Sequence, residues 1–146
     1  MKKRIAVILV ILCIMSSFAG CGEEKKGDKE KEMIDMTHMS GNVIYGEVFA
    51  MMTEPQEYEG KTIRIKGLFN KQKDTETGKD YYFVLITDAQ ACCQQGIELK
   101  GKDDAPPRGL PALGEEMVVE GKFGKYEVNG RKYYCIFVEK ITSPVE

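Results

Sequence analysis

The sequence has a single histidine, His38, and lacks the motifs on which common enzyme active sites depend. It contains no G-x-S-x-G segment and no glycine-rich phosphate-binding loop. One histidine outside any regular pattern does not supply a Ser-His-Asp triad. Acidic pairs such as Glu115-Glu116 fall at the start of an expected strand, where solvated charge is the ordinary explanation. We therefore expect a protein that is not an enzyme.

The sequence also lacks an apolar run of the length that spans a bilayer. Its most apolar stretch, Ile5 to Ile14, follows Lys2-Lys3-Arg4 and precedes Phe18-Ala19-Gly20-Cys21. This order resembles the signal of bacterial lipoproteins, whose lipobox cysteine is acylated and becomes the first residue of the mature protein. The resemblance implies a signal peptide over residues 1–20 and a palmitate-type lipid anchor on Cys21. An uncleaved N-terminal helix is the alternative, and it too places the rest of the chain outside the cytoplasm.

Basic residues are not in excess, because the chain has 21 Lys and Arg against 23 Asp and Glu. Removal of residues 1–20 takes away three basic residues and no acidic one, so the net charge becomes 18 − 23 = −5. Nucleic-acid binding normally requires a basic surface that neutralises phosphates. We therefore expect no nucleic-acid partner. The expected partners are the membrane, through the lipid anchor, and a protein or small ligand.

The segment after the signal, residues 21–41, is expected to be a charged flexible tether. Residues 22–32 contain only Gly, Glu, Lys and Asp, and no apolar side chain repays the entropy of ordering them. Met33, Met36, Met39 and His38 then fall within seven residues, a combination that suits Cu(I). The ordinary explanation is that these methionines fill gaps at the edge of the core.

From Val43 the pattern is that of a folded domain, which we assign to residues 42–146. The apolar residues Ile44, Val48, Met51 and Met52 predict one face of a short helix that ends at Glu54-Pro55. Two segments, 60–69 and 114–123, then share one design: each begins with Gly, alternates polar with apolar residues, and has an internal Gly and a final Phe. Such internal glycines mark strands that bend to serve two sides of a closed sheet.

Three further strands are expected, over residues 81–87, 96–100 and 131–141. Asn129-Gly130 predicts a type I′ hairpin turn before the last strand. Three prolines between residues 103 and 113 exclude a strand there and indicate a surface connection. Five strands in this order, with one short N-terminal helix, predict a mainly β protein with a small Greek-key barrel of the OB type.

Residues 43–142 resemble bacterial extracytoplasmic OB-fold domains, because a short helix leads through Tyr58-Glu59-Gly60-Lys61 into the first bent strand. Within that group, the segment from Thr87 to Cys93 is similar to a Cys-Cys segment in the outer domain of a poorly characterised permease-like membrane protein family. That family has a suspected link to zinc, so the resemblance implies zinc as a candidate cofactor. The permease helices are absent from this sequence, and transport is not implied.

Three cysteines fall in the expected domain, Cys92, Cys93 and Cys135, and the sequence allows three interpretations of them. Cys135 is a small core residue of the last strand and the Cys-Cys pair is an ordinary loop. Alternatively, the three thiolates bind zinc or copper, with His38, Asp88 or water as the fourth ligand. Adjacent residues of a strand point to opposite faces, so this needs a turn, which Gln94-Gln95-Gly96 would provide. The third interpretation is a thiol redox protein in which two of the cysteines form a disulfide.

Two tyrosines, Tyr81 and Tyr82, lie on the second barrel strand, which often contributes to ligand binding in OB folds. One of the two must face outward, where it would form a shallow platform for a peptide, glycan or partner protein. The sequence therefore favours a membrane-anchored extracytoplasmic lipoprotein that acts as a non-enzymatic binding or adaptor module. Metal binding or delivery is the alternative function, and thiol redox chemistry is the third.

Overall fold

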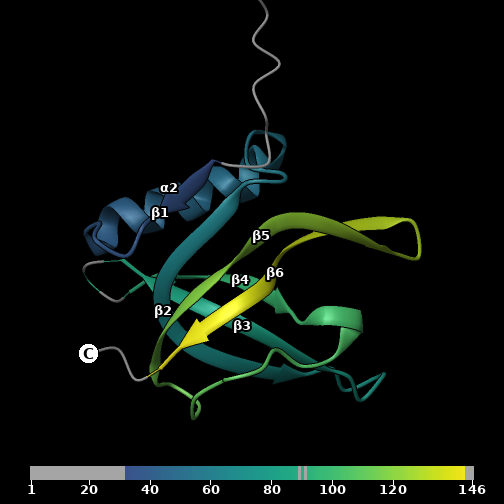
Figure 1. Cartoon of the computed structure of the whole chain (residues 1–146). Helices are drawn as coiled ribbons and strands as arrows, with labels where there is room; N and C mark the ends of the chain where they lie inside the picture. The colour runs from purple at the N-terminus through teal and green to yellow at the C-terminus, as the bar shows by residue number, and fades with distance from the viewer. Residues whose placement is uncertain (1–31, 89, 91, 144–146) are drawn as a thin grey trace, which may run out of the picture.

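The computed structural model describes residues 32–88, 90 and 92–143, and Figure 1 shows their arrangement. The signal peptide 1–20, the lipidation site Cys21 and residues 22–31 of the predicted tether lie outside the described residues. Five strands form the barrel. In chain order they are β2 (Thr62–Lys73), β3 (Asp80–Thr87), β4 (Gln94–Lys100), β5 (Glu116–Val128) and β6 (Arg131–Thr142). A short strand, β1 (Met33–Asp35), and one α-helix, α2 (Gly41–Thr53), precede them.

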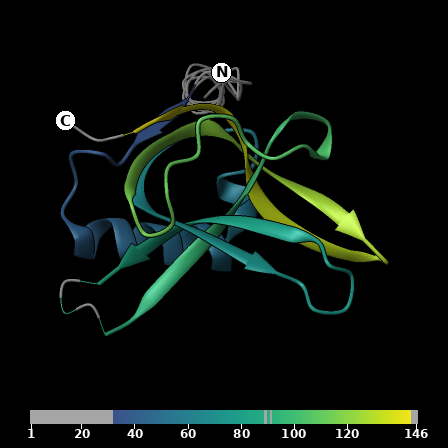
Figure 2. The ribbon, with the colours of Figure 1, turned by 90° about the horizontal axis from the view of Figure 1, so that it is seen from below.

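The sheet closes on itself in the order β2-β3-β4-β6-β5, with β5 pairing back onto β2. All of these pairs are antiparallel except β4 with β6, which is parallel. This arrangement confirms the predicted mainly β, five-stranded OB-like barrel with one short helix. The β5–β6 hairpin extends well beyond the barrel wall (Figure 2).

The internal glycines of β2 and β5 lie where the predicted bends are required. At Gly67 and Leu68 the strand β2 changes partner, from β5 to β3. A Cβ on Gly67 would lie 2.6 Å from the carbonyl oxygen of Leu85, so only glycine allows this approach. In β5, the pairing with β6 shifts register between Glu120 and Gly121. The hairpin turn is also as predicted, because Asn129 and Gly130 have φ values of 51° and 77°.

The core fills the barrel and is closed at one end by α2. Alternate residues of the strands point inward, among them Ile63, Ile65 and Phe69 as predicted for β2. The buried face of α2 consists of Ile44, Val48 and Met51, whereas Met52 is exposed, contrary to the prediction. Met52 lies one position beyond Met51, and the 100° step of the helix turns it away from the sheet.

The folded part begins earlier than residue 42, the predicted boundary. Residues Met33–Asp35 form β1, which pairs in parallel with Thr62–Arg64 of β2. Met36 follows immediately and is completely buried, and its backbone N–H donates to the carbonyl oxygen of Arg64 at 2.8 Å. The end of the predicted flexible tether is thus an edge strand of the domain. β1 has only three residues, and an alternation of polar and apolar side chains over so short a segment does not predict a strand.

Candidate functional site

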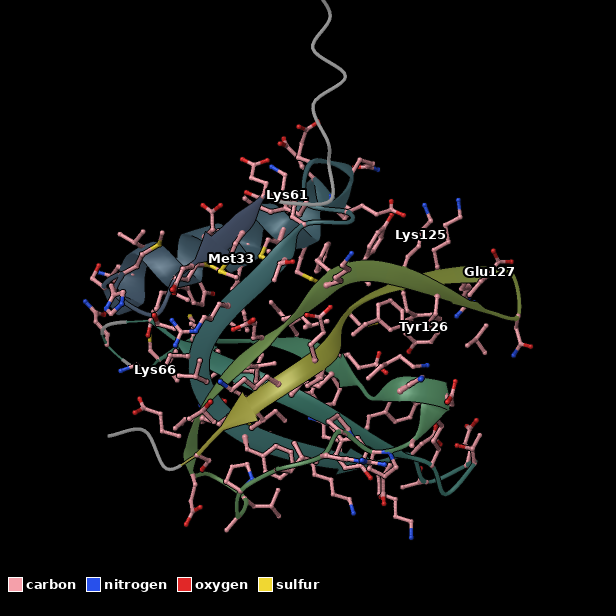
Figure 3. All side chains as sticks on the ribbon, viewed as in Figure 1. Met33, Lys61, Lys66, Lys125, Tyr126 and Glu127 are labelled. Carbon is pink, nitrogen blue, oxygen red and sulfur yellow. The ribbon has the colours of Figure 1, made fainter. Side chains whose placement is uncertain are left out.

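The β5–β6 hairpin bends over the outer face of β4 and is joined to it by Tyr126. The Tyr126 hydroxyl donates a hydrogen bond of 2.6 Å to Oε2 of Glu98, and Nζ of Lys100 lies 3.8 Å from the centroid of the Tyr126 ring. Tyr133 lies opposite Tyr126 in the hairpin and stacks on it, with ring centroids 5.5 Å apart. Lys125 and Tyr126 point to opposite sides of β5, and Tyr126 points toward the barrel (Figure 3).

A groove of about 1270 Å³ lies beside Tyr126, between the hairpin, the end of β4 and the proline-containing loop. Its volume exceeds the about 300–1,000 Å³ of sites that enclose a small ligand, as suits an open groove that holds a longer segment. The described residues that line it come from four separate parts of the chain: Lys79 before β3, Lys100–Asp103 and Ala105–Arg108 around the end of β4, Lys122 and Tyr126–Val128 of β5, and Phe137–Glu139 of β6.

The groove is basic, although the protein as a whole is acidic. Among the described residues, five cationic side chains line it: Lys79, Lys100, Lys102, Arg108 and Lys122. Three acidic side chains of the described residues line it as well: Asp103, Glu127 and Glu139. None of the ion pairs among the described residues involves Arg108 or Lys122. The excess of positive charge favours an anionic ligand.

The aromatic residues give the groove apolar contact surface. Phe137 and Tyr126 line it, and Phe137 is 38% exposed. Burial and the hydrogen bond to Glu98 raise the pKa of Tyr126 far above its ordinary value. Tyr126 therefore stays a neutral hydroxyl and keeps the hairpin bound to β4 over the physiological pH range.

Tyr81 and Tyr82, the predicted ligand face, lie on opposite sides of β3. Tyr82 packs against the core and stacks on Phe69, with ring centroids 6.5 Å apart. Tyr81 is therefore on the outer side, where Nζ of Lys79 lies 5.4 Å from its ring centroid. Tyr126 was not predicted from the sequence as a functional residue. A signal was present, because Tyr126 and Tyr133 lie at equal distances from Asn129-Gly130 and so pair across the hairpin.

A second cluster lies in the turn between β3 and β4, where Asp88, Cys92 and Cys93 place their ligand atoms within 4.8 Å of one another. The Sγ atoms of Cys92 and Cys93 are 3.8 Å apart, and Sγ of Cys92 donates to Oδ2 of Asp88 at 3.1 Å. Oδ1 of Asp88 accepts hydrogen bonds from the backbone N–H groups of Cys92 and Cys93, at 2.9 and 3.4 Å. Both cysteines are exposed. Without a bound cation, the hydrogen bond from Cys92 lowers the pKa of Asp88, and Asp88 raises the pKa of the Cys92 thiol.

The other predicted metal ligands lie outside this cluster. Cys135 is buried on β6, where it lies opposite Gly124 of β5 and Glu98 of β4. His38 is exposed in the turn between β1 and α2. The predicted set of three cysteines is therefore not assembled, and Asp88 stands where a third thiol was expected. The turn itself precedes Gln94, since Gln94-Gln95-Gly96 already belongs to β4.

The methionines of residues 33–39 differ in their exposure to solvent. Met36 is fully buried, whereas Met33 and Met39 are exposed, at 52% and 39%. The burial of Met36 agrees with the interpretation of these methionines as residues at the edge of the core.

No protein-family model matches the chain, and no curated protein matches it. Among the described residues, no helix has the length and apolar character needed to cross a membrane.

Proposed function

We propose that this protein is a membrane-anchored lipoprotein that acts outside the cytoplasm as a non-enzymatic binding module, and that its groove binds an acidic segment of a partner polypeptide. The proposed anchor rests on the sequence pattern that ends at Cys21. The proposed binding activity rests on one observation, the open groove between the hairpin and β4, which is basic and aromatic on an acidic protein.

A polypeptide fits this groove better than a nucleic acid does. The lining includes Asp103, Glu127 and Glu139, which would repel a continuous run of phosphates. An acidic peptide places its carboxylates at intervals, so they reach Arg108, Lys122 and Lys100 while other side chains pack on Phe137. A module held at the membrane by a lipid and carrying such a groove would act as an adaptor that retains a partner at the membrane surface.

Binding is tested with a short glutamate-rich peptide and a lysine-rich peptide of the same length, titrated into the isotopically labelled protein. We expect the acidic peptide alone to shift the amide signals of Lys100, Lys122 and Tyr126. The double change Arg108→Glu and Lys122→Glu should weaken its binding by at least about tenfold, because attraction becomes repulsion. The matched control is Lys132→Glu with Lys140→Glu, which changes the net charge equally outside the groove. If both double variants weakened binding of the acidic peptide equally, specific binding in the groove would be contradicted.

The anchor is tested by growth with labelled palmitate. We expect the wild-type chain to carry the label and to sediment with membranes, and the Cys21→Ser chain to lose both properties. Cys13→Ser is the matched control, since Cys13 lies within the apolar part of the proposed signal and should leave labelling unchanged. Retention of the label in Cys21→Ser would refute the proposed lipidation site.

A further inference from the structure

We infer that Asp88, Cys92 and Cys93 form a zinc-binding site on the turn between β3 and β4, separate from the groove. The site has two thiols and one carboxylate on the protein surface, at a place that the proposed peptide binding does not use. The inference goes beyond the proposed function and does not depend on it.

The spacing of the three groups is close to that of a tetrahedral zinc site. With Zn–S bonds of about 2.3 Å, two thiolates on one ion lie about 3.8 Å apart. The Sγ atoms of Cys92 and Cys93 are 3.8 Å apart. A thiolate and a carboxylate oxygen on the same ion lie about 3.5 Å apart. Sγ of Cys92 and Oδ2 of Asp88 are 3.1 Å apart, joined by a hydrogen bond that an ion would replace.

The turn holds these groups in place without a metal. Adjacent residues of a regular strand point to opposite faces, and Cys92 and Cys93 avoid this because they precede the first residue of β4, Gln94. Oδ1 of Asp88 accepts from the backbone N–H groups of Cys92 and Cys93, and Oδ2 accepts from Sγ of Cys92. The backbone N–H of Asp88 donates to the carbonyl oxygen of Cys93 at 3.1 Å and closes the turn. These hydrogen bonds reduce the ordering entropy that opposes binding.

The mixture of ligands selects the class of metal ion. Thiolates exclude Mg²⁺ and Ca²⁺, which prefer oxygen ligands, and a carboxylate disfavours Cu(I), which prefers sulfur. Zn²⁺ accepts both ligand types and takes water in the fourth position. On binding, each Zn–S bond replaces an S–H bond, and the two protons pass to the solvent. Because the site is exposed and keeps one position for water, its zinc can exchange with the surroundings.

The site is tested on the full-length chain in detergent, with its thiols reduced and metal removed. Zinc is titrated in competition with a chromophoric chelator, and Co²⁺ is used as a spectroscopic probe of thiolate ligation. We expect one ion per chain and a sulfur-to-cobalt charge-transfer band. Cys92→Ser, Cys93→Ser and Asp88→Asn should each weaken zinc binding by at least about tenfold, and each cysteine change should reduce the band.

Two control variants identify the ligand set. His38→Ala and Cys135→Ala should bind zinc as the wild type does, because neither residue belongs to the cluster. Loss of binding in either control would overturn the assignment of ligands. Failure of the reduced wild type to bind zinc would overturn the site itself. If the reduced wild type binds no zinc but forms a Cys92–Cys93 disulfide in air, the pair is redox-active and is not a metal site.

Discussion

At the scale of single residues, Asp35 is the best-connected carboxylate at the edge of the sheet. Oδ1 of Asp35 accepts hydrogen bonds from the backbone N–H and the hydroxyl of Thr37, at 2.9 and 2.6 Å. Oδ2 accepts one from Nη1 of Arg64 at 2.8 Å. The hydrogen bonds from Thr37, and then the Arg64 guanidinium, lower the pKa of Asp35 from 3.8 to about 2. These bonds fix the turn after β1 to β2.

We expect Asp35→Asn to lower the free energy of unfolding by about 1 kcal/mol at pH 7, a value that allows for solvent screening of a partly exposed pair. The folded-state pKa lies below the unfolded one, so the charged carboxylate stabilises the fold at pH values above 3.8. That contribution is lost as the pH falls toward 2. Urea denaturation of both proteins between pH 7 and pH 2 should show the difference shrinking in this window. The exposed Glu127→Gln is the control, and a difference independent of pH would contradict the assignment.

At the scale of secondary-structure elements, β1 is the strand through which the proposed membrane tether would connect to the barrel. It is only three residues long, and its stability depends on the pairing with β2 and on the burial of Met36. We expect β1 to open more readily than the barrel strands, because only three of its residues pair with β2 and it lies at the edge of the sheet.

We expect Met36→Ala to lower the free energy of unfolding by about 2–5 kcal/mol, the range for removing a fully buried large side chain. Met33→Ala should change it by less than about 0.5 kcal/mol, because Met33 is 52% exposed. Chemical denaturation followed by circular dichroism measures both. Equal effects of the two changes would mean that the segment before α2 does not pack as described.

The barrel strands were predictable from the sequence because each carries enough alternating residues and a turn signal to define it. The bends at Gly67 and Gly121 and the turn at Asn129-Gly130 are local properties of the chain. The pairing of β1 was not predictable, because it depends on a partner about thirty positions away in the chain.

The candidate sites were less predictable, because they depend on how elements meet in space. The cysteine pair and Asp88 were both recognised as candidate ligands, but which of His38, Asp88 and Cys135 lies close to the pair depends on the conformation of the turn. The contact of Tyr126 with Glu98 and Lys100 depends on the curvature of the hairpin over β4. The sequence did not decide which of Tyr81 and Tyr82 points inward, and in the structure it is Tyr82 that packs against the core.

At the scale of the whole molecule, the two candidate sites lie at opposite ends of β3 and β4. The course of these two strands can be followed in Figures 1 and 2. The groove is lined by Lys79, which precedes β3, and by Lys100, which ends β4. The thiol cluster lies where β3 ends and β4 begins. The eight residues of β3 separate them by about 25 Å at the usual rise of a strand.

We therefore expect the two sites to act independently. Groups this far apart, with no shared contacts, usually have additive free energies, so the affinity for the glutamate-rich peptide should agree within about twofold with and without zinc. Titration of the peptide into zinc-loaded and zinc-free protein measures this, with Asp88→Asn in the same zinc concentration as the control for ions bound elsewhere. A several-fold change that Asp88→Asn abolishes would mean that β3 and β4 move together when zinc binds. The barrel would then link metal availability to partner binding, whereas independence makes it a rigid support for two separate sites.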